Sequence, residues 1–177
     1  MLSLGIISYG VTEDLTDTTK LAINSYRPQV DELIVVENAG HIPYEADVMI
    51  SFQENQYFTR AANAILRIAR EDYIAVVNND TYLISGDLED LCIPDTITSP
   101  NPPHEAEDGI RGWFFVIPKS ILPILGYLDE KYVHFNSDVD MVNRIKELGI
   151  AWKTVSSVIV NHFEDLTRKT VPSIIVP

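Results

Sequence analysis

Two amides and a carboxylate follow directly after an apolar run near the middle of the chain. The run extends from Ile74 to Val77, and the polar residues are Asn78, Asn79 and Asp80. A short run of mostly β-branched residues bounded by polar turn formers is typical of a buried strand. Ligands of open α/β sheets bind beyond the carboxyl ends of the strands. A carboxylate there suits a metal ion or a polar substrate, but Asn-Asn-Asp is also common in simple turns.

Two further apolar runs end in polar residues. One run ends at Ser8 and Tyr9, and the next ends at Glu37 and Asn38. The carboxyl ends of parallel strands lie along one edge of a sheet, so these residues and Asp80 are expected to converge there. Convergence of three strand ends favours a binding site more strongly than any one of them alone.

The second half of the chain holds another candidate acid. Asp138 stands at the start of an amphipathic helix that continues to Leu148 and closes at Gly149. The helix dipole keeps a carboxylate ionised at that position, as a catalytic base requires. Asp is favoured at a helix N-terminus whether or not it is catalytic, so these residues alone favour a simple cap for Asp138 and a partner of the dipole for Asp140. His162 follows the last apolar run of the predicted sheet.

Hydrophobic periodicity predicts the elements that must position these side chains. Strands are expected at Leu2–Ser8, Leu33–Val36, Asp47–Phe52, Ile74–Val77, Gly112–Ile117, Trp152–Val155 and Val158–Val160. Helices are expected over Thr12–Ser25, Phe58–Ala69, Lys119–Leu125 and Asp138–Leu148, with a short helical turn at Leu88–Leu91. The Pro-rich, acidic stretch Ser99–Gly109 is predicted to be a surface loop. Alternating strands and helices in the first half predict an α/β domain with a largely parallel sheet.

Composition narrows the class of protein. The chain has 177 residues, 46% of them apolar, which suits a single domain. A net charge of −13 disfavours nucleic-acid binding without excluding it, because a local basic patch could override the repulsion. No apolar run is long enough to span a membrane, and the N-terminal stretch lacks the basic start of a signal peptide. Cys92, the single cysteine, is expected to be a small buried side chain, and a cytoplasmic location is predicted.

Several motifs, taken in order, resemble the family-two glycosyltransferases of the GT-A fold, and among them the rhamnosyltransferase-like branch. These motifs occupy 35–38, 55–63, 76–81, 112–117, 125–130, 137–141, 144–145 and 158–162. Each motif alone is degenerate, but the set in this order is fairly specific and spans Leu4 to His162. The resemblance implies a Rossmann-like, mostly parallel central sheet flanked by helices in one GT-A domain.

The resemblance also implies a metal site and a donor site. Asp80 matches the last acidic position of the Asp-X-Asp-type motif, which holds Mn²⁺ or Mg²⁺ on the donor diphosphate. Asn78 and Asn79 replace the earlier carboxylate of that motif. His162 matches a histidine that can complete the metal site, and its imidazole suits Mn²⁺ better than Mg²⁺. Glu37 stands where the family usually has Asp against the donor nucleobase.

Asp138 matches the general base of the family. Further donor-side candidates are Ser8, Tyr9, Arg60, Asn79, Arg168 and Lys169, and acceptor-side candidates are Gly112, Trp113 and Asp140. Basic residues among them would neutralise the diphosphate, and aromatic residues would stack on a base or a sugar face. Each also has a structural interpretation, as a packing residue, an exposed helix residue or a solvated charge.

The resemblance therefore implies an inverting, metal-dependent hexosyltransferase that uses a nucleoside-diphosphate sugar. Residues 1–82 would form the nucleotide-sugar-binding half, residues 83–162 the acceptor and catalytic half, and residues 163–177 a C-terminal tail that lacks most of the acceptor region of longer members. The acceptor is open: a glycan, a protein, a lipid-linked sugar, a metabolite or a modified nucleic-acid base.

Two alternative functions remain. The first is a non-catalytic nucleotide-sugar-binding module, because Ser137 replaces an acidic residue of the family, and Tyr57 and Ile65 replace glycines. The second is a nucleotidyltransferase of related fold. That class would need a basic, Gly-rich loop after the first strand, and the segment from Tyr9 to Asp14 has no Lys or Arg.

Overall fold

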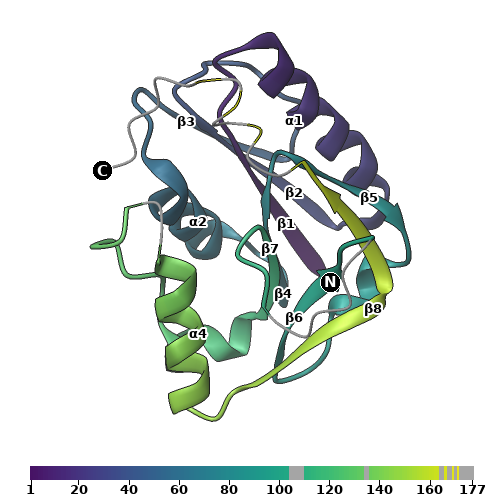
Figure 1. The fold of residues 1–177 in the computed structure, drawn as a ribbon, viewed down its shortest axis with the longest axis vertical. Helices are drawn as coiled ribbons and strands as arrows, with labels where there is room; N and C mark the ends of the chain where they lie inside the picture. The colour runs from purple at the N-terminus through teal and green to yellow at the C-terminus, as the bar shows by residue number, and fades with distance from the viewer. Residues whose placement is uncertain (104–109, 134–135, 164–165, 167–168, 170, 172–177) are drawn as a thin grey trace.

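A central sheet organises the computed structural model, which describes residues 1–103, 110–133, 136–163, 166, 169 and 171. Within these residues, the strands follow the order β3-β2-β1-β4-β7-β6-β8-β5 (Figure 1). Their bounds are β1 Leu2–Ser8, β2 Glu32–Asn38, β3 Val48–Phe52, β4 Tyr73–Asn78, β5 Thr81–Ser85, β6 Thr96–Asn101, β7 Phe114–Pro118 and β8 Ala151–His162. Strands β3, β2, β1 and β4 are parallel, whereas β7 is antiparallel to its neighbours.

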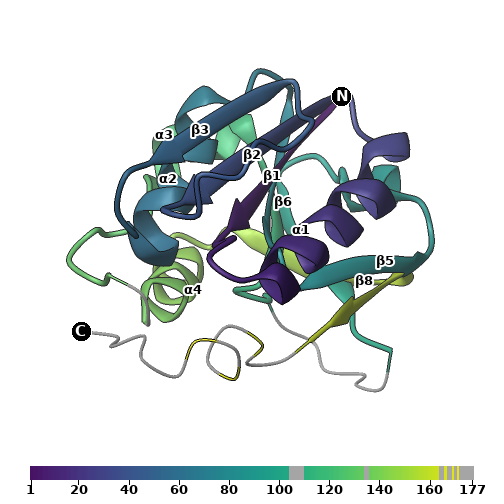
Figure 2. The same ribbon diagram turned by 90° about the horizontal axis from the view of Figure 1, so that it is seen from above.

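Helices cover both faces of the sheet (Figure 2). They are α1 Glu13–Tyr26, α2 Tyr57–Ile68, α3 Leu122–Leu125 and α4 Ser137–Glu147, with 3₁₀ turns η1 Arg27–Gln29, η2 Leu88–Leu91 and η3 Lys119–Ile121. Ala22, Ile23 and Tyr26 of α1 pack in one core cluster with Leu4 and Ile6 of β1. The other cluster joins α2, α3 and α4 to the opposite face of the sheet. The predicted α/β class and mostly parallel sheet are confirmed.

The first strand lies close to α2. A Cβ at Gly5 of β1 would lie only 2.3 Å from the Ile65 side chain of α2. This contact explains how Ile65 fits at a position where the resembling family has glycine, because Gly5 provides the space that its side chain fills. At the end of α4, Gly149 has a φ of 64° and closes the helix in the left-handed conformation, as its sequence position predicted.

Three strand predictions were wrong in detail. The two short strands expected from 152 to 160 are one strand, β8, and the break at Ser156-Ser157 is a register irregularity opposite Pro100 and Asn101 of β6. Strands β5 and β6 were both missed, and β5 is defined by antiparallel pairing with β8 and not by its own apolar pattern. Residues 99–101, expected in a loop, end β6, and 104–109 lie outside the described residues.

The prediction for Cys92 holds in part. Its side chain is only partly exposed, and burial raises the pKa of the thiol to about 11, so it is a poor nucleophile near neutral pH. Among the residues that the structure describes, no helix is long and apolar enough to cross a membrane.

Candidate functional site

The carboxyl ends of three neighbouring strands meet at one edge of the sheet. Ser8 at the end of β1 lies opposite Glu37 of β2. Ile7 lies opposite Asn78 at the end of β4, so that Asp80 follows at the same edge. The register of the parallel strands therefore produces the convergence that the apolar runs predicted.

Glu37 is a fully buried carboxylate that joins two loops. One oxygen accepts hydrogen bonds from the backbone N–H groups of Gly10, at 3.0 Å, and Gly40, at 2.9 Å. The other oxygen accepts a hydrogen bond from the hydroxyl of Ser8 at 2.6 Å. Both oxygens thus face groups of the protein, and Glu37 fixes the loop after β1 against the loop after β2. The Tyr44 hydroxyl lies 3.2 Å from Ser8 Oγ and belongs to the same cluster.

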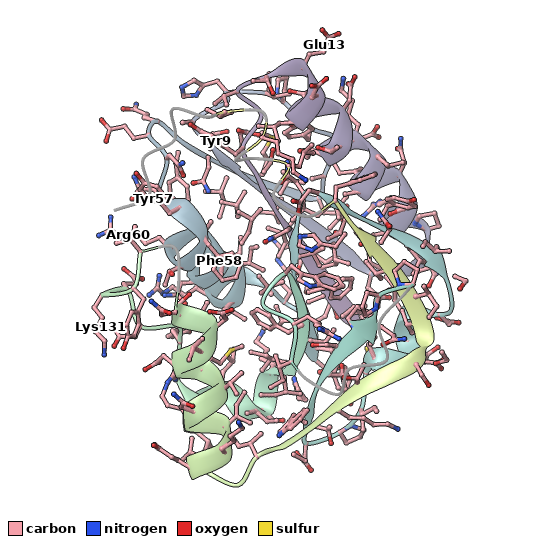
Figure 3. The ribbon with its side chains drawn as sticks, viewed as in Figure 1. Tyr9, Glu13, Tyr57, Phe58, Arg60 and Lys131 are labelled. Carbon is pink, nitrogen blue, oxygen red and sulfur yellow. The ribbon has the colours of Figure 1, made fainter. Side chains whose placement is uncertain are left out.

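These two loops and the start of α1 border an open hollow of about 520 Å³. It is lined by Gly10, Val11, Thr12, Glu13, Thr16, Ala39, Gly40 and Ile42. Tyr9 directly precedes the first lining residue and is half-buried. Figure 3 shows Tyr9 farther inside the molecule than Glu13 at the start of α1. The hollow is therefore adjacent to three predicted donor-side residues, namely Ser8, Tyr9 and Glu37.

Asn79 is buried and its side chain is turned toward α1. The amide nitrogen donates to the hydroxyl of Thr19 at 2.9 Å and to the carbonyl of Leu15 at 3.3 Å. Its backbone N–H donates to the carbonyl of Ile7 at 3.2 Å. Asn79 therefore anchors the turn that follows β4.

Asp80 and His162 face each other across this turn. Oδ1 of Asp80 lies 3.4 Å from Nε2 of His162, and the Asp80 side chain is 9% exposed. The antiparallel pairing of β5 with β8 sets this contact, because it places Thr81 opposite His162. A carboxylate oxygen and an imidazole nitrogen thus lie close enough to bind one ion between them.

The indole ring of Trp113 stacks on the imidazole ring of His162. The two rings are stacked, with centroids 4.9 Å apart and an angle of 16° between their planes. The backbone carbonyl of Trp113 also accepts a hydrogen bond from Asn78, at 2.9 Å. Trp113 is therefore part of the wall of the Asp80–His162 site, although sequence reasoning assigned it to the acceptor side.

The Asp80–His162 pair fits a divalent cation. Among the described residues, Asp80 Oδ1 has no hydrogen-bond partner although it is buried, and an orphaned buried oxygen is costly unless something else binds it. Oxygen and imidazole ligands together suit Mn²⁺. Over the same described residues, no group of three or more His, Cys, Asp or Glu side chains gathers to hold an ion. The described residues would therefore supply two ligands, and a bound phosphate would supply more.

Asp138 lies in the first turn of α4, next to Gly112. A Cβ at position 112 would lie 2.8 Å from Oδ2 of Asp138 and 3.2 Å from its Cβ. The other carboxylate oxygen, Oδ1, accepts the backbone N–H of Val139 at 2.9 Å. Gly112 and Asp138 thus lie close together, and the missing side chain at Gly112 leaves room for the carboxylate.

The Asp140 side chain is bonded to an arginine of its own helix. Its Oδ2 accepts a hydrogen bond from Nε of Arg144 at 2.9 Å. Arg144 in turn donates to the backbone carbonyls of Leu125 and Tyr127, the latter at 3.2 Å. Asp140 therefore orients an arginine that ties α4 to the end of α3.

Arg60 lies on the outer side of α2, where Figure 3 shows it near Tyr57 and on the same side as Lys131. Its guanidinium donates to Gln56 at 2.9 Å and lies 3.6 Å from Glu130. With its side chain 59% exposed, Arg60 is paired at the surface. Of the two basic residues predicted in the tail, Lys169 is exposed and Arg168 lies outside the described residues.

Sequence reasoning gave no role to three buried polar residues that organise the site. Thr19 and Tyr26 of α1 bond to the turn around Asp80, and Asn63 of α2 holds the segment before α4 by bonding both the N–H and the carbonyl of Leu128, each at 2.9 Å. All three are completely buried. A polar residue on the inner face of an amphipathic helix was the signal that could have identified them.

Solved structures share this fold at low sequence identity. The structure of S. aureus TarS 1–349 has a TM-score of 0.63 and 10% identity, over 89% of this chain and 59% of that one. The mannosyltransferase PcManGT from Pyrobaculum calidifontis, in complex with GDP-Man and Mn²⁺, has a TM-score of 0.66 and 13% identity, over 91% and 56%. Glucosyl-3-phosphoglycerate synthase from Mycobacterium tuberculosis, in complex with Mn²⁺, UDP and glucosyl-3-phosphoglycerate, has a TM-score of 0.67 and 14% identity, over 96% and 74%.

No family model and no curated protein matches the chain in sequence. The chain spans somewhat more than half the length of the TarS fragment and of the mannosyltransferase. At such identities the likeness establishes the architecture. The chain has the GT-A fold of the glycosyltransferases that it resembles.

Proposed function

We propose that this protein is an inverting, metal-assisted glycosyltransferase, which moves a sugar from a nucleoside-diphosphate sugar to an acceptor hydroxyl. The observation that carries the proposal is the Asp80–His162 pair, a buried oxygen and an imidazole nitrogen 3.4 Å apart at the strand-end edge of a GT-A sheet. Two similar structures hold Mn²⁺ together with GDP-Man or UDP, which supports the same class of ligand here.

The Asp80 carboxylate and the His162 imidazole would hold Mn²⁺ or Mg²⁺ against the donor diphosphate. A cation bound there stabilises the charge that develops on the leaving diphosphate. The hollow between the loops after β1 and β2 would receive the nucleoside. Glu37 and Ser8 would shape the hollow by holding its two loops together. Tyr9, which directly precedes the lining residue Gly10, would be the aromatic residue that stacks on the base.

Asp138 is the proposed base. It accepts the proton of the acceptor hydroxyl while the hydroxyl oxygen forms a bond to the anomeric carbon of the sugar. The bond between that carbon and the diphosphate breaks, and its electron pair leaves with the diphosphate. Attack opposite the leaving group inverts the anomeric centre. Gly112 leaves the carboxylate the room that this position requires.

A thermal-shift panel of nucleotide sugars, each with and without Mn²⁺, tests the donor. Ligands that bind the folded chain raise its melting temperature in proportion to occupancy, so a true donor gives a shift that is larger with Mn²⁺. A panel in which Mn²⁺ changes no ligand's shift would contradict the metal-assisted proposal.

Asp138→Asn tests the base separately. The variant is expected to bind the donor normally but to lose turnover by a factor of about 10²–10⁴. Glu147→Gln, at the exposed end of the same helix, is the matched control and should leave turnover unchanged. Normal turnover in Asp138→Asn would remove the base assignment. Donor binding without any turnover in the unaltered chain would favour the binding module instead.

A further inference from the structure

Two residues that flank Asp80 in the sequence are both hydrogen-bonded to helix α1. Before Asp80, the side-chain amide of Asn79 donates to the hydroxyl of Thr19 at 2.9 Å. After Asp80, the hydroxyl of Thr81 accepts from the hydroxyl of Tyr26 at 2.9 Å. Figure 2 shows α1 beside β5, the strand that this turn begins. One helix therefore holds the turn on both sides of the proposed metal ligand.

These contacts lie in the interior of the protein. Thr19 and Tyr26 are completely buried, Thr81 is 1% exposed and Asn79 is 5% exposed. Burial raises the pKa of the Tyr26 phenol far above its ordinary value, and the protonated phenol donates a hydrogen bond to Thr81. A buried polar contact that is fully satisfied specifies one arrangement, because every alternative leaves a donor or acceptor without a partner.

The Thr19 hydroxyl also reaches the loop after β1. It lies 3.1 Å from the hydroxyl of Ser8, which donates to the Glu37 carboxylate at 2.6 Å. Thr19 thus contacts two parts of the site. One is the cluster of Ser8 and Glu37 at the strand ends beside the hollow, which we call the strand-end cluster, and the other is the turn that carries Asp80. The Thr19 hydroxyl donates to the carbonyl of Leu15 at 2.8 Å, which fixes its own orientation.

We propose that Thr19 and Tyr26 are positioning residues, which hold the turn at Asp80 so that its carboxylate faces His162. The inference rests on the proposed function, because it assigns the residues that make the cation site rigid. Among the described residues, Oδ1 of Asp80 has no hydrogen bond that would fix it, and the His162 imidazole lies 3.4 Å away. Its direction is therefore set through the backbone by Asn79 and Thr81. Groups hydrogen-bonded to a metal ligand change metal affinity by about 10–100-fold when removed, and the lower end of that range is expected for residues that act through the neighbours of the ligand.

Direct metal binding can be measured through Trp113, because its ring stacks on His162 with a centroid separation of 4.9 Å. The chain has two tryptophans, so Trp152→Phe leaves Trp113 as the single reporter. Mn²⁺ is a paramagnetic quencher, and its titration against Trp113 fluorescence in a fixed excess of inorganic pyrophosphate, which supplies phosphate ligands but no sugar, reports occupancy of the site without turnover. Circular dichroism and the melting temperature of each variant show that it is folded.

The Trp152→Phe chain is the parent for the variants. In this parent, Thr19→Val keeps the branched shape but removes the hydroxyl, and is expected to raise the half-saturating Mn²⁺ concentration by about tenfold or more. Thr19→Ser, which keeps the hydroxyl, should restore binding close to that of the parent. Thr18→Val is the matched control on the same helix, because the Thr18 hydroxyl bonds to the helix's own carbonyls at Asp14 and Leu15. Tyr26→Phe removes the other hydroxyl alone and should weaken Mn²⁺ in the same direction, which gives a second test if Thr19→Val does not fold.

The outcomes separate this inference from the proposed function. Saturable quenching in the parent, with half-saturation unchanged in folded Thr19→Val and in Tyr26→Phe, overturns the positioning role and leaves the metal site intact. Absence of saturable quenching in the parent overturns the metal site itself, and the positioning role with it. An equal loss in Thr18→Val would attribute the effect to general loosening of α1 and would also overturn the proposal.

Discussion

Nε2 of His162 lies 3.4 Å from Oδ1 of Asp80, although the two residues are far apart in the sequence. The contact follows from strand register: β5 starts directly after Asp80, and its first residue, Thr81, is paired with His162 of β8. A slip of one residue would turn His162 to the opposite face of the sheet. The stacked ring of Trp113 restricts the orientation of the imidazole. The proposed metal site thus depends on strand pairing, because His162 ends β8 and Asp80 lies in the short turn directly before β5.

The contact between Gly112 and Asp138 predicts a position-specific loss of activity. Gly112→Ala places a methyl group 2.8 Å from Oδ2 of Asp138, so the carboxylate must move. Because a shift of about 1 Å can reduce a rate about 10²-fold, turnover is expected to fall by at least about tenfold. Nucleotide affinity should stay the same, since the strand-end cluster around Glu37 is untouched. Steady-state kinetics and nucleotide titration measure the two effects.

Gly149→Ala is the matched control for that change. Gly149 has a φ of 64° but no neighbouring atom within 4 Å of an added Cβ. Alanine there should cost about 1 kcal/mol of stability and leave turnover unaltered. Equal turnover in Gly112→Ala and the unaltered chain would show that Asp138 is not held where the proposed chemistry needs it.

Glu37 predicts a stability effect with a binding consequence. In Glu37→Gln, the side-chain amide group has to face either the N–H groups of Gly10 and Gly40 or the Ser8 hydroxyl. With the amide nitrogen toward Ser8, the amide oxygen still accepts from Gly10 and Gly40, but the Ser8 hydroxyl has to turn away and the bonds lose the negative charge, which costs about 1–3 kcal/mol. We expect a lower free energy of unfolding in urea and weaker nucleotide binding. Glu147→Gln, an exposed substitution of the same kind, should change neither, and an unaffected Glu37→Gln would mean that the loops hold together without this carboxylate.

Glu130 predicts a dependence of stability on pH. Hydrogen bonds from Asn63 and then from Arg67 lower the pKa of the Glu130 carboxyl. A lowered pKa in the folded state means that Glu130 adds stability above its unfolded pKa, about 4.3, and that this contribution is lost as pH falls through the folded value. The stability gap between the unaltered chain and Glu130→Gln should therefore shrink from about pH 6 to pH 3. Urea unfolding at several pH values measures the gap, and a gap that stays constant would contradict the role of the charge.

The sequence predicted the first half of the fold well because each strand there has its own apolar run. Strands β1, β2 and β4 are buried on both faces, and their polar ends at Ser8, Glu37 and Asp80 mark the site directly. Strands β5 and β8 lack that signal. Their place depends on pairing with each other, so local patterns gave two short strands for β8 and none for β5.

The individual roles within the site were harder to predict than its location. Glu37 was expected to meet the nucleobase, and the structure shows each of its oxygens bonded to the protein. Thr19 and Tyr26 received no role, because a polar residue on the buried face of a helix indicates a hydrogen bond but does not show which residue it bonds to. Their partners, Asn79 and Thr81, are remote in sequence, and such contacts emerge only when the helix packs on the sheet.

Calorimetric titration of UDP and GDP, each in the presence of Mn²⁺ and in the presence of EDTA, tests the central claim most directly. The account predicts that Mn²⁺ strengthens binding of at least one nucleotide by about tenfold or more. Asp80→Ala should abolish that gain, while Asp17→Ala, which removes an exposed carboxylate of α1, should preserve it. Mn²⁺-dependent binding that survives in Asp80→Ala, or nucleotide binding to the unaltered chain that Mn²⁺ does not change, would contradict a cation site at Asp80 and His162.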